Sequence, residues 1–137
     1  MRFLDTNIIL RYLTRDDPAK AQACFLLFQQ VKQGSEQLQT TESVIAEATY
    51  VLTSPRHPYK LDHATITALL LPIVRLRSLK IPRKRVVIRA LELYEQYPRL
   101  DFEDCLNVAT MTQDNLQEIV SYDRGFDNVP GITRQEP

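Results

Sequence analysis

Residues 1–13 read MRFLDTNIILRYL, a short apolar run that leads into Asp5 and a longer one that follows it. Met1 to Leu4 predict a short strand that ends at Asp5. Thr6 or Asn7 can then cap a helix that runs through Ile8 to Leu13, because Thr and Asn side chains accept hydrogen bonds from free helix N–H groups. A strand followed directly by a helix, with an acidic residue at the junction, is the first indication of an α/β chain.

The same alternation continues along the chain. Further strands are predicted at residues 37–40, 78–81 and 118–122, and a last short one near Ile132. Helices are predicted from Asp17-Pro18 to about Lys32, from Thr41 to Ser54-Pro55, from Asp62 to a kink or early end at Pro72, over residues 83–97, and from Asp101 onward. Strands separated by helices imply crossover connections and a parallel sheet. The predicted class is α/β, with a parallel sheet of four to five short strands.

Bulk composition describes an ordinary globular chain. The 137 residues fit one domain over 1–137. Seventeen basic residues balance seventeen acidic ones, which argues against a general polyanion binder but leaves room for a local basic patch. Cys24 and Cys105 lie outside any metal-binding spacing and are interpreted as small buried hydrophobic residues. No signal peptide or membrane span is expected, so the predicted location is the cytoplasm.

Two acids follow predicted strands and two lie on predicted helices. Asp5 and Asp123 come directly after strands, and the carboxyl ends of parallel strands share one edge of a sheet, so these acids should converge there. Glu47 borders the apolar stripe of its helix. Asp104 flanks the stripe of another helix, and Asp101, three residues earlier, can face the same volume. Glu103 should point to solvent.

Several carboxylates in one pocket repel one another unless a cation or a proton is present. Mg²⁺ or a similar hard ion, bound by oxygen ligands, resolves this and supports phosphodiester hydrolysis. Each acid also has a simpler interpretation, because Asp5 and Asp101 suit helix caps, Glu47 a solvated helix face and Asp123 a turn. The two histidines, His57 and His63, are expected at the surface.

The ordered set of motifs resembles the PIN-domain ribonucleases, and most closely their VapC-like toxin branch. The resemblance covers nearly the whole chain, although Asn107 and Ser121 depart from the commonest pattern. The matching segments are residues 3–13, 16–18, 43–47, 50–52, 90–94, 100–104 and 121–126.

The resemblance implies a three-layer α/β/α fold with a central parallel sheet flanked by helices. It also implies Mg²⁺ or Mn²⁺ held by four carboxylates, with RNA as substrate. The implied ligands and catalytic residues are Asp5, Glu47, Asp104 and Asp123, supported by Thr6, Asn7, Asp101 and Ser121. The implied partners are a VapB-like antitoxin and a second copy in a homodimer, with no membrane. A housekeeping RNA-processing enzyme of the same fold, or a non-catalytic RNA- or protein-binding module, remains an alternative.

Basic residues are candidates for RNA contacts. Residues 75–89 carry seven of them, which fits a solvated helix face as well as an RNA track. Within that segment the candidates are Arg83, Lys84 and Arg85, while Arg11 and Arg15 lie closer in sequence to the acidic site.

Overall fold

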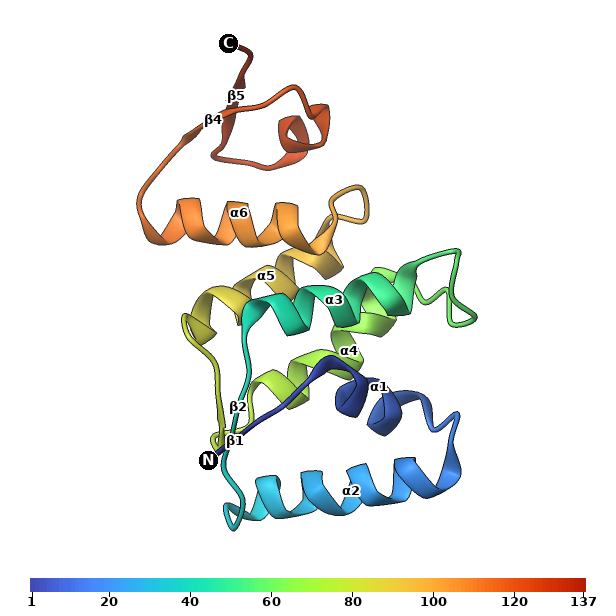
Figure 1. The fold of residues 1–137 in the computed structure, drawn as a ribbon. Coiled ribbons are helices and arrows are strands. Elements are labelled where there is room, and N and C mark those ends of the chain that lie inside the picture. Colours follow the sequence, from blue (N-terminus) through green and yellow to red (C-terminus); the bar gives the residue numbers. More distant parts are fainter.

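Strands and helices alternate in the order that the sequence predicted (Figure 1). The computed structural model describes residues 1–137. The strands are β1 (Arg2–Phe3), β2 (Leu38–Gln39), β3 (Leu79–Lys80), β4 (Glu118–Val120) and β5 (Thr133–Gln135). The helices are α1 (Thr6–Thr14), α2 (Pro18–Gln33), α3 (Glu42–Thr53), α4 (His63–Val74), α5 (Lys84–Gln96), α6 (Phe102–Gln113) and the 3₁₀ helix η1 (Arg124–Asn128). The α/β class is confirmed, with strands shorter than expected.

Local signals fix most helix ends. The Asp17 carboxylate accepts from the Lys20 N–H at 3.2 Å, Pro18 occupies the first position of α2, and Gly34 ends that helix with φ of 81°. A positive φ is a conformation that glycine adopts without steric cost. In α4 the helix continues through Pro72 to Val74, so the early end expected there is wrong. Pro72 has no N–H to donate to the carbonyl four residues earlier, and the helix continues for only two residues beyond it.

The five strands form two sheets, both parallel. In the first, β2 lies between β1 and β3, with Arg2 opposite Leu38 and Leu38 opposite Leu79. In the second, β4 pairs with β5 alone. Figure 1 shows the β4–β5 pair beyond α6, on the other side of that helix from β1. The single sheet that the sequence predicted is therefore divided, because α5 and α6 lead the chain away from β3 before β4 begins.

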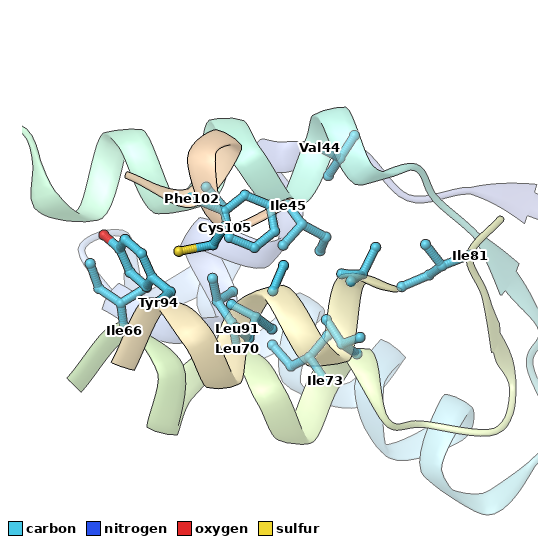
Figure 2. Close-up of a cluster of buried hydrophobic side chains, with 14 of the residues drawn as sticks. Val44, Ile45, Ile66, Leu70, Ile73, Ile81, Leu91, Tyr94, Phe102 and Cys105 are labelled. Atoms are coloured by element: carbon cyan, nitrogen blue, oxygen red, sulfur yellow. The ribbon is translucent and has the colours of Figure 1, made fainter. Parts of the chain in front are cut away.

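The core lies where α3, α4, α5 and α6 meet. Figure 2 shows Ile45, Ile66, Leu70 and Leu91 directed into one apolar cluster. Tyr94 extends this cluster and meets Phe102 edge to face, with ring centroids 6.2 Å apart. Burial of such side chains is the main contribution to stability. It holds α6, and with it the acids at its first turn, against the rest of the chain.

The surroundings of the cysteines and histidines can be compared with the burial and exposure that the sequence predicted for them. Cys24 and Cys105 are free and buried, as predicted. His63 is only partly exposed, because its ring stacks on Tyr94 at 3.6 Å and its Nδ1 lies 2.9 Å from the Tyr94 carbonyl oxygen. His57 is partly exposed as well, so neither histidine is the exposed surface residue that the sequence predicted. None of the helices combines the length and apolar character needed to cross a bilayer.

Replacing Leu91 by alanine should lower the free energy of unfolding by about 2–5 kcal/mol, because Leu91 is fully buried and its truncation leaves a cavity. The matched control is Leu26→Ala on α2, where the side chain is 55% exposed and the loss should stay within about 0.5 kcal/mol. Urea unfolding followed by circular dichroism measures both. Equal losses at the two positions would contradict this account of the core.

Candidate active site

Asp5 stands at the junction of β1 and α1. The preceding Leu4 is buried and its N–H donates to the Gln39 carbonyl at 2.7 Å, so the main chain is fixed up to the acid. Asp5 itself is the N-cap of α1, a position for which the sequence suited Asp5 as well as Thr6 or Asn7. Its side chain makes no capping hydrogen bond and is exposed. The carboxylate is therefore free to bind a ligand.

Thr6 links this junction to Glu47 on α3. Thr6 is only 4% exposed, and its Oγ1 donates to Glu47 Oε2 at 2.8 Å. The bond orients the Glu47 carboxylate toward the segment that carries Asp5. The supporting role expected for Thr6 has this contact as its physical basis. Asn7 is exposed, and its side chain makes no hydrogen bond in the structure.

Asp101 and Asp104 form a reciprocal cap at the start of α6. The Asp104 N–H donates to Asp101 Oδ1 at 2.7 Å, and the Asp101 N–H donates to Asp104 Oδ2 at 3.2 Å. This is a capping box, in which each side chain satisfies a free main-chain N–H of the other. The two carboxylates share one small volume, as their spacing predicted.

The pKa of Asp104 is raised from its ordinary value of 3.8 to about 6. Burial is the largest cause, the negative charges of Asp101 and Asp123 act in the same direction, and the main-chain N–H of Asp101 opposes the rise. Low-dielectric surroundings and neighbouring charges of the same sign both favour the neutral carboxyl. Asp104 is thus a partly buried carboxyl with other negative charges close to it.

Asp123 follows β4 and caps η1. Its Oδ1 accepts from the Gly125 N–H at 2.8 Å, and its own N–H donates to Ser121 Oγ at 3.0 Å. A Cβ at Gly125 would lie 3.0 Å from both Asp123 Oδ1 and Leu100 Cδ2, closer than real Cβ contacts normally come. Gly125 therefore lets the Asp123 turn pack against the residue that precedes Asp101. Ser121 supports the turn through its hydroxyl.

The predicted acids fall into two sets within the chain. Asp5 and Glu47 belong to one set through Thr6, whereas Asp104, Asp101 and Asp123 belong to the other. No group of three or more acids, histidines or cysteines is close enough to hold one metal ion. Asp5 and Asp123 both follow strands, as predicted, but those strands lie in separate sheets.

A groove of about 640 Å³ runs between α3 and α6. Glu47 lines one wall and Glu103 the other, and Arg83 is the one cation among the lining residues. The Arg83 guanidinium also donates to Thr110 Oγ1. Glu103 is exposed as expected, but its place opposite Glu47 depends on how two distant helices pack, which no local pattern in the sequence shows.

The PIN domain family model matches residues 2–132, nearly the whole chain. The chain belongs to the PIN domain family. A relative from Aquifex aeolicus named VapC ribonuclease is 28% identical over 126 residues, which are 92% of this chain and 90% of the relative. Another, Ribonuclease VapC13 from Mycobacterium tuberculosis, is 26% identical over 136 residues, 98% of each chain. The family resemblance seen in the sequence is confirmed.

The basic residues predicted to contact RNA differ in whether their charged groups already have partners within this PIN domain. Arg11 is paired with Asp16 at 2.8 Å, and the pairing raises the pKa of the guanidinium. The Lys84 ammonium donates to the main-chain carbonyls of Leu76 and Leu79, and burial lowers its pKa. Arg15 and Arg85 are exposed, and neither makes a side-chain hydrogen bond. Arg83 alone faces the groove that Glu47 lines.

The raised pKa of Asp104 predicts a change of stability with pH in metal-free buffer. A carboxyl whose pKa is higher in the folded chain stabilises it below about pH 4, and that contribution is lost as the pH rises through about 6. Asp104→Asn keeps an oxygen that accepts from the Asp101 N–H but cannot ionise. Its free energy of unfolding should therefore rise relative to wild type between about pH 4 and 7.

Urea unfolding of both proteins across that pH range, in the presence of a chelator, measures the difference. The control is Glu103→Gln, the exposed neighbour on the same turn, for which the difference from wild type should stay nearly constant. A constant difference for Asp104→Asn as well would show that no crowding of charge acts on Asp104.

Proposed function

We propose that this chain is a metal-dependent endoribonuclease that hydrolyses RNA phosphodiester bonds and acts as the toxin of a toxin–antitoxin pair. The observation that carries the proposal is the placement of four acids on the elements of a PIN domain: Asp5 after β1, Glu47 on α3, Asp104 in the first turn of α6 and Asp123 after β4. Relatives named as ribonucleases match along at least 90% of their own length, which supports it.

The proposed metal ligands are Asp5, Glu47, Asp104 and Asp123, and the proposed ion is Mg²⁺ or Mn²⁺. The donor chemistry fits, because all four offer carboxylate oxygens, which hard divalent ions prefer. The raised pKa of Asp104 follows first from burial and then from neighbouring negative charges, and a cation would offset those charges. No three of these acids lie close enough together in the structure to hold one ion. A bound ion of this kind lowers the pKa of a coordinated water and offsets charge on the phosphate.

Neighbouring residues hold these acids in place. Thr6 holds one oxygen of Glu47, leaving the other oxygen to complete the metal shell or to orient the attacking water. Asp101 anchors the first turn of α6 and so fixes the main chain at Asp104. The Gly125 N–H and the Ser121 hydroxyl fix the turn at Asp123. Preorganised groups of this kind reduce the reorganisation needed during reaction.

RNA is proposed to enter along the groove between α3 and α6, where Arg83 contacts a phosphate. Lys84 is left out of this contact set because its ammonium is engaged by main-chain carbonyls. The family resemblance further supports a VapB-like antitoxin as partner and residues 1–137 acting as one nuclease domain. The same resemblance supports a homodimer.

Asp5→Asn and Asp104→Asn should each lower cleavage of total cellular RNA by at least about 100-fold, because each removes a charge that holds the ion. The assay incubates purified protein with RNA, with and without Mg²⁺ or Mn²⁺, and follows fragments on denaturing gels. The matched control is Asp114→Asn, at the exposed C-terminal cap of α6, which should cleave like wild type.

Retained cleavage in both acid variants would remove these residues from the site. Absence of metal-dependent cleavage by wild type would direct attention to the non-catalytic alternative. Calorimetric titration of wild type with Mn²⁺ then decides whether the acids bind a cation at all.

Arg83→Gln should weaken RNA binding and make its salt dependence shallower by about one phosphate contact. Binding is measured in a chelator, so that cleavage does not interfere, by fluorescence anisotropy over a range of salt concentrations. Arg77→Gln, which removes an exposed charge outside the groove, is the control and should leave the slope nearly unchanged. Equal effects at both positions would show that the groove is not where RNA binds.

A further inference from the structure

Tyr50 is an exposed aromatic residue in the wall of the groove between α3 and α6. It lies one helical turn after Glu47, and 55% of the residue is exposed. Its ring meets the His57 ring edge to face, with centroids 6.5 Å apart, and its hydroxyl makes no hydrogen bond in the structure. The ring is therefore steadied by one contact, while most of its surface remains available to a ligand.

A small recess of about 80 Å³ adjoins the groove at the first turn of α6. Tyr50 and Glu103 line both the recess and the groove, so they face the same space from α3 and from α6. The buried rings of Tyr94 and Phe102, labelled in Figure 2, form the aromatic floor of the recess. An exposed ring with a carboxylate opposite suits an unpaired nucleobase, which stacks on aromatic side chains and bonds through its edge.

The loop that joins α3 to α4, residues 54–62, holds the histidine that contacts this ring. The His57 N–H donates to the carbonyl of the buried Ser54 at 3.2 Å. Further along the loop, the Tyr59 hydroxyl donates to Asp16 Oδ2 at 2.8 Å and so ties the loop to the segment between α1 and α2. The aromatic pair is thus in place before any ligand binds, which reduces the ordering cost of binding.

The same loop supplies positive charge that the groove lacks. Three glutamates line the groove against the single cation Arg83. Arg56 and Lys60 of the loop are exposed, and neither side chain makes an ion pair or a hydrogen bond. Free cations of this kind contact phosphates, whatever the base sequence. An RNA strand that leaves the groove over this loop therefore has partners for both its phosphates and one of its bases.

We propose that Tyr50 and Glu103 form a subsite for one unpaired nucleobase of the RNA. The base stacks on the Tyr50 ring, and the Glu103 carboxylate accepts a hydrogen bond from an amino group on the edge of the base. Residues three apart on a helix lie about 5–6 Å from each other, so the base belongs to a nucleotide next to the phosphate at Glu47. The subsite rests on the proposed function, because it requires RNA to lie in this groove.

The carboxylate gives the subsite a chemical preference. An ionised carboxylate accepts hydrogen bonds and donates none. Cytosine presents an amino group at the position where uracil presents a carbonyl oxygen, and a carbonyl oxygen facing a carboxylate is repelled. The subsite therefore favours cytidine over uridine.

Binding of oligocytidine and oligouridine of equal length tests the stacking. The two carry the same charge, and binding is followed by fluorescence anisotropy at neutral pH in a chelator, so that cleavage does not interfere. Tyr50→Leu should weaken the binding of both by at least about fivefold, because the aromatic surface is lost. The matched control Tyr50→Phe keeps the ring and should bind both as wild type does. Circular dichroism confirms that each variant is folded.

The same assay tests the base preference. Wild type should bind oligocytidine about tenfold more tightly than oligouridine. Glu103→Gln should reduce this ratio to about twofold or less, because an amide can donate to the uracil oxygen as well as accept from the cytosine amino group. The matched control is Glu95→Gln, an exposed glutamate on α5 outside the groove, which should keep the full ratio.

Separate results keep the subsite and the nuclease proposal apart. Unchanged RNA binding by Tyr50→Leu, or a preference for cytidine that survives Glu103→Gln, would overturn the subsite even where wild type cleaves RNA. Losses as expected in a wild type that cleaves with no metal would support the subsite and remove the nuclease proposal. A changed mass of Tyr50→Leu in light scattering, with unchanged RNA affinity, would assign Tyr50 to a protein contact and also overturn the subsite. A wild type that neither binds nor cleaves RNA would overturn both.

Discussion

Pairing between β1 and β2 fixes the position from which the acidic site is built. Each strand spans two residues, so the ladder itself supplies few hydrogen bonds. Two contacts strengthen it at its end: the Leu4 N–H donates to the Gln39 carbonyl at 2.7 Å, and the buried Thr40 hydroxyl donates to the Leu4 carbonyl at 2.8 Å. Because a buried main-chain carbonyl without a partner is costly, these bonds tie down the residue immediately before Asp5. Thr6 and Glu47 are positioned by the same junction.

Sequence alone was enough for the elements and for the local contacts between near neighbours. Asp17-Pro18 and Gly34 marked the ends of α2, and the three-residue spacing of Asp101 and Asp104 anticipated their shared cap. Such signals act within a few residues and so can be seen in the order of the chain. The N-cap of α1 was left open between Asp5, Thr6 and Asn7, because Asp, Thr and Asn all suit that position, and Asp5 occupies it.

Contacts between distant segments were beyond the reach of sequence patterns. The bond from Thr6 to Glu47 spans 41 positions, and the placement of β4 beyond α6 depends on how α5 packs on α6. The rule that strand ends converge holds within one sheet, and nothing in the residues 114–117 announced that β4 would leave the first sheet. His63 was misjudged for the same reason, since its neighbour Tyr94 lies 31 residues away.

The reciprocal cap of Asp101 and Asp104 has a consequence for how these two positions can change. The same two carboxylates close the first turn of α6 and repel each other, so the local fold and the local charge depend on the same atoms. Replacing either by an apolar residue would relieve the repulsion but leave a main-chain N–H without its partner. The range of residues open to these positions during evolution is therefore narrow.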